Sequence, residues 1–228
     1  MMDIDDAKIV RLKRKVTVAQ EEFDMAVTFH EIWKPAAYDQ ELHNRLGKSY
    51  ATQAFFVTRT ALRREMVLAL IRLWDTNRKA LRMQSIWHEL RDPEVVHSLA
   101  LERANRMGLT GVFEAVKEHL AEKANKVIGL IGKYIEGGPR NNVLESLRAL
   151  RHERLAHRQI SEAMAAGATA TDEEIEEFYQ DNSKLIHILL SLVNATAYDP
   201  EDTARVYRFY AKSFWARVQQ DEKVIYQD

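Results

Sequence analysis

The few helix-breaking residues of this sequence lie at the ends of segments with helical periodicity, and this placement constrains the fold more than any other feature. The 228 residues include only 8 glycines and 4 prolines. Both residue types disfavour helix interiors, so the long stretches between them permit long helices. Apolar residues recur at helical spacing within these stretches, and no stretch alternates as a β-strand would. The sequence therefore predicts an all-α protein, a single-domain bundle of long antiparallel helices.

Capping residues predict where the individual helices begin and end. Asp92 and Asp199 each precede a proline, which is the order of an N-cap residue and the first helical position. Thr171 and Glu174 have the spacing of a capping box. The Gly-Gly-Pro triplet that begins at Gly137 is the clearest break in the chain. These signals predict helices over residues 5–33, 39–74, 81–90, 93–107, 110–136, 141–159, from 172 onward, and 199–221.

The composition limits the classes of function that the chain can have. The formal net charge is −1, so any attraction to nucleic acid must come from a local basic patch. The absence of cysteine excludes disulfides and thiolate metal sites, and fits a reducing compartment. The first residues, MMDIDDAKIV, lack the basic and apolar regions of a signal peptide, and no apolar stretch is long enough to span a bilayer. We expect a cytoplasmic protein, one domain over residues 1–228, without membrane contact.

The segment LRALRHERLAHRQ, residues 147–159, begins as an amphipathic helix and then turns strongly basic. With residues placed about 100° apart, four leucines form one apolar stripe along this helix: Leu144, Leu147, Leu150 and Leu155. Three arginines project from within the same stripe: Arg151, Arg154 and Arg158. His157 borders it. Because a buried, unpaired arginine is too costly, this half of the helix must face carboxylates, a water-filled cleft or a ligand.

Two structural explanations of the basic segment stand beside a functional one. Residues 172–177 hold five acids and no base, and they would neutralise the arginines. Arginine and histidine also favour the last turn of a helix, where the helix dipole is negative.

The motif from Arg151 to His157, RHERLAH, resembles the R-x(4–6)-H motif of the HEPN superfamily, whose all-helical domains are often metal-independent ribonucleases. The wider phrase LRHERLAHR is similar to the form found in the abortive-infection branch of that superfamily. The segment ALRREMVLALIRLWD, residues 61–75, also resembles that branch, in which a long helix ends on an aromatic–Asp pair. The resemblance covers roughly residues 22–196 and implies a HEPN-like core there, followed by the helix over residues 199–221.

Two other residue pairs fit the bare motif: Arg82 with His88, and Arg91 with His97. Neither has three arginines on the packed face of its helix, nor a loop of small residues directly after it.

The resemblance implies roles for individual residues. His157 would act as general acid or base, and Arg151 would bind the scissile phosphate, without a metal or other cofactor. His152 follows the motif arginine where ribonuclease members usually carry Asn or Asp, and its imidazole would take over that hydrogen-bonding role toward the RNA. The helical wheel, rather than the motif, adds Arg154 and Arg158 as further RNA contacts.

The resemblance also implies partners. Family members usually dimerise so that two motif helices face each other across a basic cleft, so we expect a homodimer that acts on RNA. A phage-defence or toxin–antitoxin system is the expected setting, and in the latter an antitoxin protein would be a further partner. Two alternatives stay open: a catalytically silent helical module that binds RNA or a partner protein, and a structural dimer whose arginines pair with residues 172–177.

Several other residues have more ordinary explanations. The four tryptophans are predicted to anchor the core: Trp33, Trp74, Trp87 and Trp215. His187 lies in a strongly apolar segment and is predicted to be a core histidine. The cluster of Arg59, Arg63 and Arg64 is either a second RNA contact or a solvated face. The last helix bears four apolar residues at helical spacing: Val206, Tyr210, Phe214 and Val218.

Overall fold

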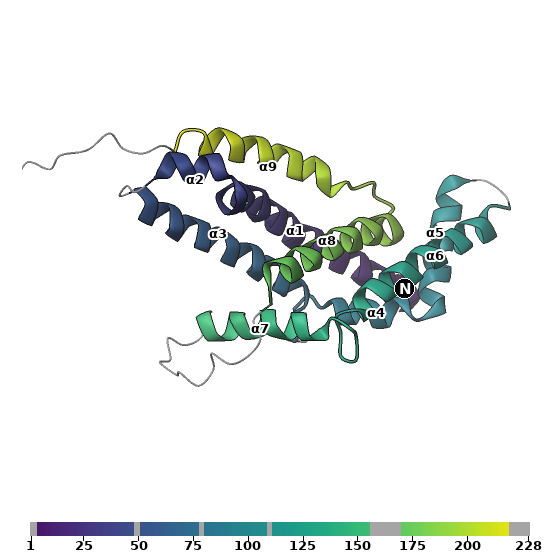
Figure 1. The fold of residues 1–228 in the computed structure, drawn as a ribbon. Helices are drawn as coiled ribbons and strands as arrows, with labels where there is room; N and C mark the ends of the chain where they lie inside the picture. The colour runs from purple at the N-terminus through teal and green to yellow at the C-terminus, as the bar shows by residue number, and fades with distance from the viewer. Residues whose placement is uncertain (1–3, 48–50, 78–79, 109–110, 156–169, 219–228) are drawn as a thin grey trace, which may run out of the picture. The chain divides into compact units, whose positions relative to one another are not determined.

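A computed structural model describes residues 4–47, 51–77, 80–108, 111–155 and 170–218, and the side chains of all of these except residues 4–6 and 151–155. Within these residues every regular element is a helix, and a single isolated β-bridge joins Trp74 and Arg82 (Figure 1). The prediction of an all-α protein is confirmed. No helix in this part of the chain is both long enough and apolar enough to cross a membrane.

The contacts within the chain define two compact units, residues 1–23 with 70–198 and residues 24–69 with 199–228. Two helices contribute residues to both units: α1 (Ile4–Tyr38) and α3 (Ala51–Leu73). The first unit also contains α4 (Met83–Leu90), α5 (Pro93–Met107), α6 (Phe113–Gly132), α7 (Asn141–Leu155), α8 (Asp172–Leu189) and the π-helix η2 (Leu190–Asn194). The second unit also contains α2 (Gln40–Leu46) and α9 (Pro200–Trp215).

The first unit is organised around α6, which packs against α4, α5 and α8. The buried residues of α6 recur at helical spacing along one stripe: Leu120, Ala124, Val127 and Ile131. The first part of α1 is joined to the short helices by three ion pairs: Lys8 with Asp92, Lys13 with Glu102, and Lys15 with Glu89. The apolar stripe of α6 is therefore buried against its neighbours, and ion pairs between charged side chains join α1 to α4 and α5.

The second unit has a small apolar core that includes Trp215. The Trp215 ring packs edge-on against Phe55, with 5.5 Å between ring centroids. The indole N–H of Trp215 donates to the carbonyl of Ile32 at 2.9 Å, and Arg45 donates to the carbonyl of Trp215 at 3.1 Å. One tryptophan at the end of α9 thus holds together α1, α2 and α3 in this unit.

The capping residues act as predicted. The side chains of Asp92, Thr171 and Asp199 each accept a hydrogen bond from a backbone N–H of the helix that they begin. The break at Gly137 has a positive φ of 83°. A Cβ on Gly138 would lie 2.2 Å from the carbonyl oxygen of Gly132, so this turn requires glycine.

The predicted end of the first helix at residue 33 is wrong, because α1 continues through Pro35 to Tyr38. The proline removes one backbone donor from the helix. The turn that follows it nevertheless buries Ala36 and Ala37, and the N–H of Asp39 donates to the carbonyl of Pro35 at 2.9 Å. Burial of this last turn outweighs the missing hydrogen bond.

Further boundaries differ from the predictions, among them the end of α6, which lies at Gly132 instead of residue 136. The segment predicted as one helix from residue 39 to 74 is divided into α2 and α3 at Gly47, whose φ of 52° ends α2. The last helix ends at Trp215 instead of residue 221. Arg217 and Val218 form i to i−3 backbone bonds there, to Phe214 and Trp215, which tighten the chain into a turn.

Candidate functional site

The helix that carries the basic motif, α7, is packed along its N-terminal part. Val143, Leu144 and Leu147 are buried and Leu150 is half-buried, as the predicted stripe requires. Leu155 belongs to the part of α7 whose side chains are not described. The packed residues therefore end one turn before the motif begins.

Hydrogen bonds hold the same part of α7 to the segments before it. The amide of Asn141 donates to the carbonyl of Tyr134 at 3.0 Å. The guanidinium of Arg148 donates to the carbonyl of Trp74 at 2.6 Å and pairs with Glu145 at 2.6 Å. Arg148 thus satisfies a carbonyl at the end of α3, directly before the aspartate of the Trp-Asp pair. This arginine was not among the predicted site residues.

A polar network fixes the loop that leads into α7. Lys133 pairs with Glu177 and Asp181 of α8, each at 2.6 Å, and the hydroxyl of Tyr134 donates to Asp181 at 2.8 Å. Arg140 donates to Glu177 at 2.6 Å. The two ends of the loop are therefore tied to the same face of α8, and α7 starts from a fixed point.

Burial and hydrogen bonding act on the titration of two groups in this network. Burial alone would lower the pKa of Lys133, but the hydrogen bonds to Asp181 and Glu177 outweigh it and raise the pKa above its ordinary value. Burial raises the pKa of Tyr134, and its hydrogen bond to Asp181 raises it further. Lys133 therefore stays charged and the Tyr134 hydroxyl stays protonated, so both act as donors that position α7.

The Trp-Asp pair that ends α3 lies against this network. The ring of Trp74 packs against those of Tyr134 and Phe178, at centroid distances of 5.6 and 5.8 Å. Its indole N–H donates to the side chain of Asn182 at 2.9 Å, and Asn182 donates to the carbonyl of Phe178 at 2.7 Å. The end of α3, the loop before α7 and the middle of α8 thus share one aromatic and hydrogen-bonded core.

An open cavity of about 320 Å³ lies between the end of α3 and the packed part of α7. It is lined by apolar and amide groups together with three carboxylates and Arg148: Trp74, Asp75, Thr76, Gln84, Ile135, Glu136, Asn141, Leu144, Glu145 and Arg148. An adjoining cavity of about 350 Å³ shares five of these residues and extends along α7 to Ala149. The surface beside the start of the motif is therefore hollowed and polar.

The structure describes the backbone of three of the five predicted site residues and the side chains of none of them. Arg151, His152 and Arg154 lie in the last turns of α7, in the stretch whose side chains are not described. His157 and Arg158 lie outside the described residues. The convergence of their side chains on one crevice therefore stays a prediction.

One of the two other residue pairs that fit the bare motif, Arg91 with His97, is used in packing. The guanidinium of Arg91 lies 4.3 Å above the ring of Trp87, and His97 packs edge-on against Phe113 at 5.1 Å. Packing against aromatic rings therefore explains the presence of both residues without a functional role.

The acidic segment at the start of α8 has cationic partners that precede the motif. Glu177 pairs with Lys133 and Arg140, and Glu174 lies 3.8 Å from Arg140. These two acids therefore form ion pairs with the loop before α7. Within the described residues, no group of three histidine, aspartate or glutamate side chains has the arrangement of a metal site.

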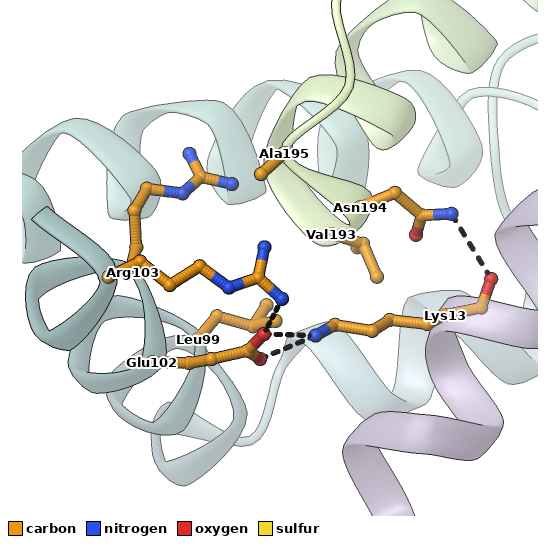
Figure 2. A pocket seen from close by; sticks show the side chains of 8 residues that line it. Lys13, Leu99, Glu102, Arg103, Val193, Asn194 and Ala195 are labelled. Atoms are coloured by element: carbon orange, nitrogen blue, oxygen red, sulfur yellow. Dashed lines mark hydrogen bonds and ion pairs between the residues drawn. The ribbon is translucent and has the colours of Figure 1, made fainter.

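A much smaller cavity of about 20 Å³ lies where α1, α5 and η2 meet (Figure 2). Lys13 pairs there with Glu102, and the amide of Asn194 donates to the carbonyl of Lys13. Arg103 donates to the carbonyls of Ser191 and Leu192, which the irregular turns of η2 leave available. The cavity has about the volume of one water molecule, so it is too small for a substrate, and its residues serve to hold α1, α5 and η2 together.

The model of the HEPN_AbiU2 family, described as AbiU2, matches residues 9–214. No curated protein and no solved structure matches the chain. The family match covers most of both compact units and includes α7 and the sequence positions of all five predicted site residues. The chain therefore belongs to the AbiU2 family, in the abortive-infection branch of the HEPN superfamily.

Proposed function

We propose that this protein is a metal-independent endoribonuclease of a phage-defence or toxin–antitoxin system, with Arg151 and His157 as its catalytic pair. The observation that carries the proposal is the position of the motif in a chain of this family. Arg151 follows directly on the part of α7 that is held by buried leucines and by Arg148. The motif therefore begins beside an anchored part of the helix, and catalysis requires groups that start from a defined position.

The chemistry follows from the two residue types. His157 takes the proton of a ribose 2′-hydroxyl, and the 2′-oxygen attacks the adjacent phosphorus. The bond from phosphorus to the 5′-oxygen breaks and that oxygen takes a proton from water, while the protonated His157 returns its proton to the solvent. Arg151 binds the phosphate oxygens, where negative charge develops. The products are a 2′,3′-cyclic phosphate and a 5′-hydroxyl.

The remaining cations of the motif extend the site along the RNA backbone. Arg154, Arg158 and His152 bind phosphates on either side of the scissile bond. A homodimer in which two motif helices line one hydrated cleft would keep these charges solvated. In a toxin–antitoxin setting, an antitoxin protein would cover the same basic surface.

The test is cleavage of a structured RNA by the purified protein in the presence of EDTA. We expect cleavage by the unmodified protein, and a loss of about 10²- to 10⁴-fold in rate for His157→Ala and for Arg151→Ala. His119→Ala, which removes an exposed histidine of α6, is the matched control and keeps the rate. Cleavage that His157→Ala leaves unchanged would remove the enzymatic proposal.

A second candidate function is a catalytically silent module that binds RNA or a partner protein. The observation that favours it is His152, which stands where ribonuclease members usually carry Asn or Asp. This alternative predicts binding that weakens with Arg151→Ala or Arg154→Ala and with added salt, and no cleavage at any protein concentration.

A further inference from the structure

The C-terminal helix α9 carries apolar side chains on two opposite faces. One face is buried within the second unit: Ala204, Ala211 and Trp215. The opposite face carries four large side chains that are 46% to 66% exposed: Val206, Phe209, Tyr210 and Phe214. At about 100° per residue these four form one continuous stripe. A helix that is apolar on two faces is expected to be covered on both, so the exposed stripe indicates a missing partner.

Charged residues of opposite sign lie at the two ends of this stripe. Asp202 lies one turn before Val206, and Arg217 follows Phe214 in the turn after the helix. The backbone at Ala216 keeps near-helical angles, φ −63° and ψ −23°, so Arg217 stays on the side of the stripe. The stripe is thus acidic at its start, apolar in its middle and basic at its end.

The stripe is complementary to itself when it is reversed. Positions at equal distances from the midpoint of the stripe form four pairs: Asp202 with Arg217, Arg205 with Phe214, Val206 with Ser213, and Phe209 with Tyr210. If two copies of α9 lie antiparallel, opposite charges therefore meet at the two ends and aromatic rings meet in the middle. This is the property of an isologous interface, in which the same surface of both molecules is related by a twofold axis.

We propose that the exposed stripe of α9 binds the same stripe of a second copy of this chain, with the two helices antiparallel. Asp202 then meets the partner's Arg217 at each end of the interface. Asp202 already pairs with Arg205 on its own helix, at 2.7 Å, but both side chains are largely exposed. Such a surface ion pair contributes little free energy, so Asp202 exchanges it readily for the new partner.

This interface is separate from the one expected between motif helices. The helix α9 belongs to the second compact unit, and the motif helix α7 belongs to the first. The pairing of α9 does not depend on ribonuclease activity, and a protein without catalytic activity would show it equally.

Disulfide formation tests the proposal in the full chain, because the sequence contains no cysteine of its own. The double variant Val206→Cys with Ser213→Cys is oxidised mildly and run on a denaturing gel without reductant. Antiparallel pairing places the cysteine at position 206 of one copy opposite the cysteine at position 213 of the other. We therefore expect a reducible band at twice the 26.4 kDa of the chain. The two thiols of one molecule lie about 10 Å apart along the helix, too far for a bond within the chain.

The single variants and charge reversals complete the test. Val206→Cys alone and Ser213→Cys alone should give no dimer band, whereas parallel helices would join two copies through Val206→Cys alone. In the double-cysteine background, Asp202→Arg or Arg217→Asp should each reduce the dimer band several-fold, and both together should restore it. Lys212→Asp, on the flank of the helix, should leave it unchanged. A double-cysteine protein that stays monomeric, or a band from Val206→Cys alone, would overturn the proposal.

Discussion

Glu31 is a buried carboxylate of α1 whose partners hold α9 within the second unit. His30 lies 3.3 Å from one of its oxygens, and Arg208 donates to the other at 3.0 Å. Burial alone would raise the pKa of Glu31, but the hydrogen bonds with His30 and Arg208 outweigh it and lower the pKa. The hydrogen bond with Glu201, followed by that with Glu31, raises the pKa of Arg208, so this guanidinium stays charged.

The lowered pKa of Glu31 makes its contribution to stability dependent on pH. A carboxyl group whose pKa falls on folding stabilises the folded state above its ordinary value of 4.5, and this stabilisation disappears as the pH falls through the lower value. Glu31→Gln should therefore lower the free energy of unfolding by about 1–2 kcal/mol at pH 7. The difference from the unmodified protein should narrow steadily below pH 4.5.

Urea unfolding at pH 7 and at pH 3.5 measures this difference. Glu41→Gln, which changes an exposed carboxylate of α2, is the control and should leave stability unchanged at both pH values. Equal stability of Glu31→Gln and the unmodified protein at pH 7 would contradict the assignment.

The burial of a single residue was predictable where it follows from the residue type. It was less predictable where it depends on a hydrogen-bond partner elsewhere in the chain. Trp33, Trp74 and Trp215 are buried as predicted, and Trp87 is half-buried. His187 was predicted to be in the core but is exposed, because its Nδ1 bonds the carbonyl of Tyr198 at 2.5 Å, outside the apolar stripe of α8. Long-range partners such as these are not visible in a local pattern.

Asp181 and Asn182 are buried polar residues of α8 that the sequence analysis did not identify. They occupy the buried face of α8 between Phe178 and Leu185. Two polar residues at core positions of an amphipathic helix are a signal that their partners are buried with them. Their partners, Tyr134 and Trp74, lie more than forty residues away in the sequence.

At the scale of helices, the position of α7 depends on the contacts between the preceding loop and α8. Asp181→Asn removes one of the two carboxylates that pair with Lys133 and weakens the bond from Tyr134. We expect the free energy of unfolding to fall by about 1–3 kcal/mol, because the half-buried lysine keeps only Glu177 as an ionic partner. Tyr134→Phe removes one hydrogen bond and should cost about 1 kcal/mol.

Denaturant unfolding of these two variants is compared with that of Glu173→Gln, which removes an exposed charge from the first turn of the same helix. If Asp181→Asn lowers the free energy of unfolding no more than Glu173→Gln does, the contacts of Lys133 and Tyr134 with α8 do not hold the loop.

Helix starts were more predictable than helix ends. The caps at Asp92, Thr171 and Asp199 are local, since side chain and backbone partner lie within three residues. The ends of α1 and α9 depend instead on tertiary contacts, namely burial of the turn after Pro35 and packing of Trp215. Patterns within one helix do not report such contacts, so the end of α1 was placed too early and that of α9 too late.

The apolar series of the last helix also has a tertiary explanation. Val206, Tyr210 and Phe214 repeat at the spacing of a core face, yet the structure leaves all three exposed and buries Ala204, Ala211 and Trp215 instead. Periodicity shows that two faces of α9 are apolar without indicating which one the chain itself covers.

At the scale of the whole molecule, the sequence motif predicted the family and the helical periodicity predicted the all-α class. The family match confirms the first and the structure confirms the second. The order of the helices brings the Trp74–Asp75 pair and the start of the motif helix to the two sides of one cavity, which neither segment reveals alone. The single-domain organisation and the meeting of Arg151 with His157 stay predictions.

The central claim is that this chain cleaves RNA through attack of the ribose 2′-hydroxyl. The most direct measurement is mass spectrometry of the product ends, with an oligonucleotide that carries a 2′-O-methyl group at its mapped cleavage site as the comparison. We expect 2′,3′-cyclic phosphate and 5′-hydroxyl ends from the unmodified RNA, and an intact methylated RNA. Cleavage of the methylated site, or products with 5′-phosphate ends, would contradict the assignment of His157 and Arg151.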